Sequence, residues 1–120
     1  MLEPDRKWLA AAAALAGVGV ALGAFGAHGL QQMVTPERLV TWDTAVRYQM
    51  DHALGLLVAS AVGLAGRGVG RWFVAGIVLF SGSLYALVLS GVGPLGAITP
   101  FGGLCFLVGW AIFARAALRS

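Results

Sequence analysis

A run of about 23 residues, from Trp8 to Leu30, contains no charged side chain. A helix of that length crosses the hydrocarbon core of a bilayer, which is roughly 30 Å thick. The run is longer than the apolar core of a cleaved signal peptide, which has about 7–15 residues. The whole chain of 120 residues is 59% hydrophobic and only 11% charged, and a soluble domain of this size cannot bury so much apolar surface. These features predict an integral membrane protein.

Three further apolar stretches have lengths suited to crossing a bilayer. The connection after the first stretch is strongly polar, and its Thr35-Pro36 pair is typical of a helix N-cap followed by proline at the first helical position. Leu39, Val40 and Trp42 then indicate a short interfacial helix, or the extramembrane start of the next span. We predict a single all-α transmembrane domain over residues 1–120, folded as a four-helix bundle with a short interfacial helix between spans one and two. The predicted spans are about 8–30, 45–65, 72–91 and 100–118.

The basic residues predict the orientation of the four spans. Both termini and the 66–71 turn would lie on one side of the membrane, with six basic residues against two on the other side. The six are Arg6, Lys7, Arg67, Arg71, Arg115 and Arg119, and the two are Arg38 and Arg47. Because short loops rich in Lys and Arg stay in the cytoplasm, both termini are predicted to be cytoplasmic. The basic residues stand at the ends of apolar runs and form no face that could follow phosphates, so no nucleic-acid partner is expected.

Small side chains recur at four-residue spacing within the spans. In lipid the hydrophobic effect does not drive helices together. They associate through close backbone approach and interhelical hydrogen bonds. The predicted packing residues are Gly19, Gly23, Gly26, Gly55, Ala59, Gly63, Gly82, Ala86, Gly102 and Gly103. Any small-residue stripe that the bundle itself leaves unused would form an interface with a second copy or with a membrane-protein partner.

Polar side chains inside the spans are expected to face the bundle interior. On the second span, Tyr48, His52 and Gly55 share one helical face because of their three- and four-residue spacing. His28 ends the first span and Thr99 starts the fourth on the same side of the membrane. We therefore predict one polar cluster in the outer half of the membrane, formed by His28, Tyr48, Gln49, His52, Tyr85 and Thr99.

Three interpretations of this cluster remain open. It is a hydrogen-bond network that fixes helix register, a binding or conduction site, or a place where His28 and His52 ligate a metal or haem, since neutral imidazole is a common ligand. Two histidines do not complete a four-coordinate zinc site, and the chain has no haem-attachment motif, so neither a metal nor a cofactor is expected. Asp51 has no convincing partner acid or nucleophile, and Ser81 and Ser83 have no adjacent base. The sequence therefore predicts no catalytic residue and no enzyme.

Five ordered motifs resemble those of a known family: Leu22 to His28 (LGAFGAH), Tyr48-Gln49 with His52, Leu79 to Tyr85 (LFSGSLY), Thr99-Pro100 with Gly102-Gly103, and Gly109-Trp110. Over nearly its whole length the chain is similar to the YgdD-like family of small bacterial inner-membrane proteins of unknown function, which has eukaryotic transmembrane relatives. The resemblance implies a four-span protein of the bacterial cytoplasmic membrane and implies no established activity.

Two functions fit these observations. The first is a non-enzymatic accessory or structural membrane protein that acts through helix-helix association. The second is an element that binds or transports a small molecule, a lipid or an ion by means of the polar cluster. The bilayer is the expected environment in both cases.

Overall fold

The computed structural model describes residues 3–120, and within that range all regular structure is helical. In chain order the elements are α1 (Arg6–His28), a 3-10 turn (Leu30–Gln32), α2 (Pro36–Ala61), a 3-10 turn (Ala65–Arg67), α3 (Val69–Gly76), a π-helical turn (Ile77–Ser81), α4 (Gly82–Ser90), a 3-10 segment (Gly93–Ala97) and α5 (Thr99–Arg119). The prediction of an all-α fold is confirmed.

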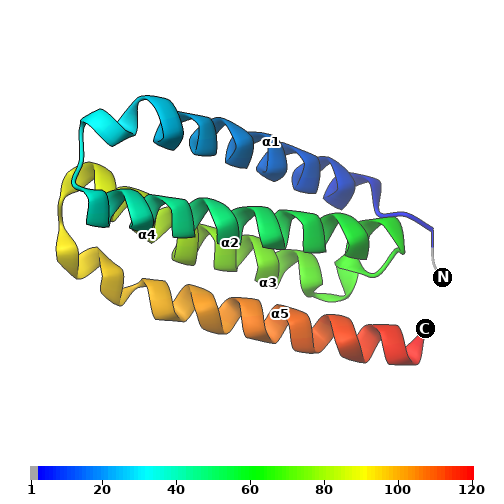
Figure 1. Cartoon of the computed structure of the whole chain (residues 1–120). Coiled ribbons are helices and arrows are strands. Elements are labelled where there is room, and N and C mark those ends of the chain that lie inside the picture. The colour runs from blue at the N-terminus through cyan, green and yellow to red at the C-terminus, as the bar shows by residue number, and fades with distance from the viewer. Residues whose placement is uncertain (1–2) are drawn as a thin grey trace.

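The helices form four long rods that lie side by side, with α3, the π turn and α4 making one rod (Figure 1). Successive rods run in opposite directions, and the start of α1 and the end of α5 lie at the same end of the molecule (Figure 1). Helix α1 packs mainly against α2, and α5 packs mainly against α3 and the π turn, so α1 and α5 form opposite edges. The Cα atoms extend over 48 × 26 × 17 Å. The arrangement is therefore flattened, with α2 and the α3–α4 rod in the middle.

Three segments are long and apolar enough to cross a membrane: Arg6–Gln32, Val69–Ser90 and Gly93–Arg119. They correspond to the first, third and fourth predicted spans. Helix α2 has 26 residues, which is long enough, but its first part is too polar to belong to this group. Its charged residues are Glu37, Arg38, Asp43, Arg47 and Asp51. Length and composition alone therefore do not support the second predicted span, residues 45–65.

Helix α2 begins at the predicted N-cap. The Thr35 hydroxyl oxygen accepts a hydrogen bond from the backbone N–H of Arg38 at 3.3 Å, and Pro36 occupies the first helical position. The helix then continues without a break to Ala61. The separate interfacial helix of the prediction is thus corrected to the first part of α2, because no glycine or proline between Pro36 and Ala45 interrupts it.

The third rod contains an irregularity that the sequence did not predict. Between Ile77 and Ser81 the backbone forms a π turn, in which hydrogen bonds span five residues in place of four. On one side, Ser81 Oγ donates to the carbonyl oxygen of Ala45 on α2 at 2.6 Å. On the other side, Gly102 of α5 lies against the backbone of Phe80. The π turn is therefore the point at which the α3–α4 rod touches both neighbouring rods closely.

Several predicted packing residues lie where two helices approach. A Cβ atom added at Gly19 would lie 2.5 Å from Met50 Sδ, and one added at Gly26 would lie 2.7 Å from Trp42 Cδ1. The other predicted packing residues that lie at helix contacts are Gly23, Gly55, Ala59 and Gly102. At Gly19, Gly26 and Gly55, a large side chain of a neighbouring helix fills the space that a side chain would need.

The structure differs from the expectation at four packing positions. Gly63 lies beyond the end of α2 with φ of 78°, so it shapes the turn and does not pack within a helix. Ala86 is exposed. Within residues 3–120, nothing lies within 4 Å of a Cβ built at Gly103, and the nearest atom to one built at Gly82 is the Ile77 carbonyl oxygen at 3.9 Å. The extra residue in the π turn rotates α4 relative to α3, so regular four-residue spacing mispredicts which face of α4 makes contact.

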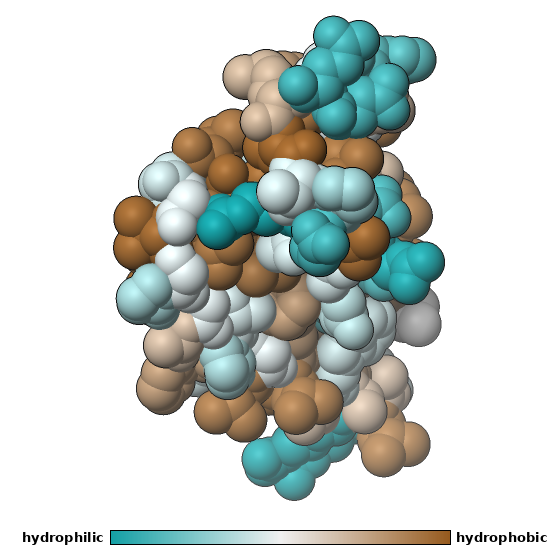
Figure 2. Space-filling model, turned by 60° about the vertical axis from the view of Figure 1, so that its left-hand side comes forward, coloured by the Kyte–Doolittle hydropathy of each residue, from teal (hydrophilic) through white to brown (hydrophobic). Residues whose placement is uncertain are grey.

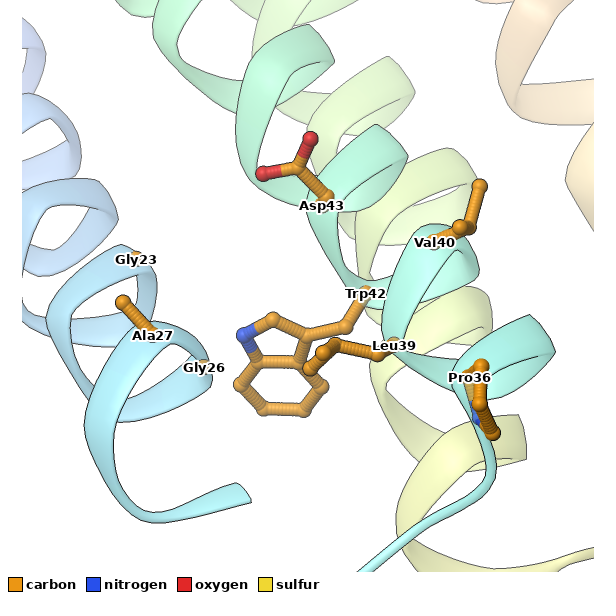
Figure 3. Close-up of a pocket in the computed structure, with 8 residues that line it drawn as sticks. All are labelled: Gly23, Gly26, Ala27, Pro36, Leu39, Val40, Trp42 and Asp43. Atoms are coloured by element: carbon orange, nitrogen blue, oxygen red, sulfur yellow. The ribbon is translucent and has the colours of Figure 1, made fainter. Parts of the chain in front are cut away.

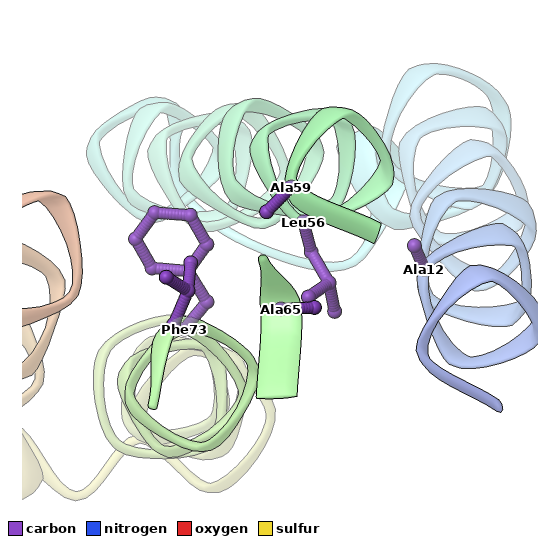
Figure 4. Packing of buried hydrophobic residues seen from close by; sticks show 6 residues of the cluster. Ala12, Leu56, Ala59, Ala65 and Phe73 are labelled. Atoms are coloured by element: carbon purple, nitrogen blue, oxygen red, sulfur yellow. The ribbon is translucent and has the colours of Figure 1, made fainter. Parts of the chain in front are cut away.

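Two buried clusters fill the interior. The first joins α1, α2 and α3 near the chain termini; five of its residues, Ala12, Leu56, Ala59, Ala65 and Phe73, are labelled in Figure 4, and Val69 completes it. The second joins Leu30, Trp42 and Val88 towards the other end.

The outer surface of the rods carries many exposed hydrophobic side chains. Among the most exposed are Val18, Val20, Phe101, Leu104 and Leu107. Hydrophilic side chains interleave with hydrophobic surface at the end that holds the α1–α2 and α4–α5 connections, which comes forward in Figure 2. Apolar rods with polar ends match a chain that sits in a bilayer.

Candidate functional site

Gln49 connects three helices in the interior. Its side chain is 2% exposed. Gln49 Nε2 donates to the carbonyl oxygen of Leu15 on α1 at 2.8 Å, and Gln49 Oε1 accepts from the Tyr85 hydroxyl on α4 at 2.6 Å. Because Leu15 is the tenth of the 23 residues of α1, this junction lies near the middle of that helix.

His52 lies in an aromatic environment between α2 and α5. Its Nδ1 pairs with the carbonyl oxygen of Tyr48 at 2.8 Å, and its Nε2 pairs with the indole Nε1 of Trp110 at 3.0 Å. A carbonyl can only accept and an indole N–H can only donate, so these bonds assign a neutral ring with its proton on Nδ1. The imidazole stacks on Phe106 with centroids 3.5 Å apart, and Phe73 meets it edge-on at 5.2 Å. His52 is thus held by bonds and by stacking at the same time.

Further side-chain bonds connect the remaining rods. Trp42 Nε1 donates to the carbonyl oxygen of Leu22 at 2.8 Å, joining α2 to α1. The hydroxyls of Ser83 and Thr99 lie 2.7 Å apart and join α4 to α5. Together with the Ser81 bond to α2, these pairs connect each rod to the next.

Arg38 closes the end of the third rod. Its Nη1 donates to the carbonyl oxygen of Leu87 at 2.9 Å, and its Nη2 donates to that of Gly91 at 3.4 Å. The last carbonyls of a helix have no partner within the helix and carry partial negative charge, so a guanidinium there is favourable. Arg38 therefore fastens the start of α2 to the end of α4.

The structure brings the six residues of the predicted cluster together only in part. Gln49 bonds to Tyr85, and Tyr48 stacks on His52 with centroids 6.2 Å apart. Thr99 pairs instead with Ser83, which the sequence analysis had not included. His28 is the last residue of α1 and is exposed, so it lies apart from the others.

His52 pairs with a residue near the middle of α5. Its partner Trp110 is the twelfth of the 21 residues of that helix. The predicted cluster did not include Trp110, Phe106 and Ser83, which contact its members. A signal existed for Trp110, because an indole N–H in the middle of a span needs an acceptor on a neighbouring helix.

The two histidines do not share a site. His28 lies two residues beyond Gly26, which packs on Trp42, whereas His52 is ten residues further along α2. Ten helical residues correspond to about 15 Å, so His28 and His52 are too far apart to ligate one metal or haem. Within residues 3–120, no three His, Cys, Asp or Glu side chains gather as a metal site requires.

The interior polar side chains are bonded to backbone carbonyl oxygens or to one another. Every buried side-chain nitrogen and oxygen atom in the described part of the chain has a hydrogen-bond partner. Such a network fixes the rotation and the depth of each helix relative to its neighbours. Each of these buried atoms therefore already has a partner within the described chain.

A groove lies between the end of α1 and the start of α2 (Figure 3). Its volume is about 440 Å³. Its lining is Gly23, Gly26, Ala27, Pro36, Leu39, Val40, Trp42 and Asp43. Glycine and alanine on α1 face the larger side chains of α2 across it, and the Asp43 carboxylate is the one charged group among these residues. The groove is apolar with a single acidic group.

The outer face of α2 carries a line of charged residues. Asp43, Arg47 and Asp51 follow one another at four-residue spacing and are all exposed, as are Leu54 and Val58 further along the same face. Arg47 and Asp51 flank Gln49, whose bond to α1 places it near mid-helix. A charged side chain at the bilayer centre costs about 2.5–3.5 kcal/mol even on insertion scales. We call this line of three residues the charged stripe.

The chain matches a family of known proteins. A family model described as "Protein of unknown function (DUF423)" matches residues 22–103. The UPF0382 membrane protein YwdK of Bacillus subtilis is 46% identical over 108 residues, covering 85% of this chain and 88% of that protein. A UPF0382 membrane protein of Staphylococcus epidermidis is 45% identical and covers 85% of this chain and 87% of its own length. One of Haemophilus influenzae is 41% identical, with coverage of 84% and 85%.

These relatives are named as bacterial membrane proteins, and none of the three names refers to an activity. An uncharacterised family of membrane proteins is what the sequence motifs implied, although the YgdD-like name itself does not occur in these three names. No solved structure matches the chain. The relatives and the three membrane-length helices together make this a multi-pass membrane protein.

Proposed function

The chain belongs to the DUF423 family of proteins of unknown function, and on that premise we propose a structural or accessory role in the membrane, exerted through helix-helix association. The role is non-enzymatic. It takes place in the cytoplasmic membrane of a bacterium, with both chain termini in the cytoplasm. The interior of the protein supplies a rigid scaffold, and the outer face of α2 supplies the surface that meets a protein partner.

The proposed topology has four spans, of which α2 is the second. Helix α1 touches α2 at two distant points: Trp42 bonds to Leu22, and the Asp5 backbone N–H donates to the carbonyl oxygen of Ser60 at 2.8 Å. The 18 residues from Trp42 to Ser60 cover about 27 Å of helix. Since α2 accompanies α1 over nearly the thickness of a bilayer core, a membrane that holds α1 also holds α2.

The paired interior supports a structural role for the polar residues. Gln49 and His52 are each bonded on both sides to groups of the same chain. A transport or binding site needs at least one polar group that can exchange its partner for the ligand. The buried polar atoms of the interior already have hydrogen-bond partners within the described chain. We therefore assign this network the role of fixing helix register.

The charged stripe is the observation that carries the proposal. Asp43, Arg47 and Asp51 are exposed on α2, and the neighbouring Gln49 bonds to the middle of α1. In the proposed four-span topology this depth lies near the centre of the bilayer. Acyl chains cannot solvate such groups, and charged residues in membranes face protein or water. A protein partner over the outer face of α2 removes the stripe from lipid.

A second candidate is the binding of a small apolar molecule or lipid chain in the groove between α1 and α2. The groove favours it because the lining is apolar and carries one carboxylate, at Asp43, that could orient a cationic or hydrogen-bonding head. This site replaces the interior polar cluster as the place where such a ligand would bind.

Photo-crosslinking in intact membranes distinguishes these functions. A benzophenone amino acid at Leu54, which is 50% exposed on the outer face of α2, is expected to form an adduct with protein. The matched control is Leu107 of α5, the helix at the opposite edge from α1. Its side chain is 67% exposed, and a probe there is expected to label lipid only. Lipid adducts alone at both positions would contradict the association role. A small-molecule adduct confined to a probe at Val40 would favour the groove.

A further inference from the structure

The arrangement of the charged stripe points to the identity of the partner. We infer that the outer face of α2 binds a second copy of this chain in a parallel two-fold dimer, in which Arg47 of each copy pairs with Asp51 of the other. This inference rests on the proposed association role and names its partner. It follows from the order of charges, from their depth and from the residues that continue the face.

The order of charges makes the stripe complementary to itself. Along α2 the stripe reads negative at Asp43, positive at Arg47 and negative at Asp51, with one helical turn of about 6 Å between neighbours. When two such helices lie parallel and in register, Arg47 lies opposite Arg47 of the other copy, and the nearest opposite charges are the carboxylates one turn above and one turn below on that helix. The long guanidinium side chain reaches that far and binds carboxylates in a forked geometry. Interhelical pairs of this kind set partner choice in coiled coils.

Two-fold symmetry and membrane orientation both select a second copy. A two-fold interface uses the same patch on both subunits, so the contact from Arg47 to Asp51 occurs twice. Two copies insert with the same orientation, because the same basic residues orient both. Their stripes therefore lie at the same depth without adjustment. A different protein would need acidic and basic groups in the complementary order at that same depth.

The residues that continue the face allow the two helices to pack. Val40 lies before the stripe, and Leu54 and Val58 lie after it; their exposed fractions are 67%, 50% and 56%. With the stripe they follow one another at spacings of three, four, four, three and four residues, which is one continuous helix face. The face is apolar at both ends and charged in the middle. Apolar ends pack against their counterparts while the central pairs are shielded from lipid.

Disulfide trapping in native membranes tests the dimer. In a Cys105→Ala background, which removes the chain's single cysteine, Leu54→Cys is expected to give a cross-linked species of twice the chain mass on mild oxidation. Leu107→Cys is the control and is expected to remain monomeric under the same conditions. Failure of Leu54→Cys to cross-link to itself, or cross-linking only to another protein, would overturn the dimer.

Charge reversal tests the pairing itself. Arg47→Asp and Asp51→Arg are each expected to lower the dimer fraction about tenfold, because like charges then face each other across the interface. The double variant, which exchanges the two charges, is expected to recover most of the dimer, and Arg47→Lys is expected to retain it. Recovery in the double variant excludes simple misfolding. Equal loss in the single and double variants, or no loss in any, would contradict the Arg47–Asp51 pair.

The dimer and the association role can be refuted separately. A protein adduct at Leu54 without a self-cross-link refutes the dimer and leaves the association role in place. Lipid adducts alone refute both.

Discussion

Replacing Gly102 with alanine is expected to destabilise the fold strongly, whereas the same change at its neighbour Gly103 is expected to be neutral or stabilising. A Cβ added at Gly102 would collide with the backbone nitrogen of Phe80 and lie 2.7 Å from its Cα. These are backbone atoms, so no rotamer change relieves the clash, and one helix has to move. Overpacking of this kind costs about 1–3 kcal/mol. The thermal midpoint of each variant in lipid vesicles or mild detergent measures the difference.

Gly103 is a closely matched control because it lies on the same helix one residue later. Within the described chain, nothing lies within 4 Å of a Cβ at this position, and alanine gains up to about 1 kcal/mol over glycine in a helix interior. Equal destabilisation by both substitutions would contradict the close approach of α5 to the π turn. Equal tolerance would contradict it as well.

The second large effect is expected for His52→Ala. The substitution removes the ring that stacks on Phe106 at 3.5 Å and leaves the indole N–H of Trp110 without its acceptor. Loss of a buried side chain of this size costs about 2–5 kcal/mol, and an orphaned donor in a dry interior adds about 1–3 kcal/mol. The thermal midpoint is expected to fall more than for any other polar substitution in the interior.

Two controls resolve this effect. Trp110→Phe keeps an aromatic ring in place and removes the indole N–H with part of the indole ring, so it is expected to cost at least about 0.6 kcal/mol, a typical value for one interhelical bond in a membrane, and less than His52→Ala. His28→Ala is expected to leave the midpoint unchanged, because His28 is exposed at the end of α1. An unchanged midpoint in His52→Ala would contradict the structural role. So would an equal fall in His28→Ala.

The membrane class and the helical rods were predictable because they depend on composition and on local signals. The uncharged run from Trp8 to Leu30 predicts α1 within two residues at each end, and Thr35-Pro36 predicts the start of α2. The second Thr-Pro pair behaves differently. Helix α5 begins at Thr99, whose hydroxyl bonds to Ser83 on α4 and does not cap its own helix. The Thr-Pro pair therefore marks the start of α5, but it does not predict which group the threonine side chain contacts.

The interior partners were less predictable, because sequence spacing gives the face of a helix but not the helix that it meets. Gln49 and Tyr85 were placed in one cluster, and they do bond. His28 was placed there too, although it ends a helix on the surface. The second span was predicted to begin at about Ala45. Helix α2 begins nine residues earlier, at Pro36. The π turn shifts the faces of α4, and no residue pattern in 77–81 announces it.

The charges on α2 acquire meaning only with the structure. In the sequence, Arg47 and Asp51 stand four residues apart in the first part of the second predicted span. In the fold they flank Gln49 near mid-helix and point away from the interior. The polar residues of α2 thus form two sets. Gln49 and His52 are buried and hydrogen-bonded, whereas Asp43, Arg47 and Asp51 are charged and exposed. The buried set holds the fold, and the exposed set is the basis of the proposed association.

The proposal that protein covers the outer face of α2 is tested most directly by measuring what surrounds this face in a bilayer. A spin label at Leu54 is expected to collide rarely both with oxygen, which dissolves in lipid, and with a water-soluble nickel chelate, because protein covers this face. A label at Leu107 is expected to collide frequently with oxygen, as a lipid-facing position does. Oxygen accessibility at Leu54 equal to that at Leu107 would show α2 bare to lipid, and high accessibility to the nickel chelate would show it in water. Either result would contradict the account.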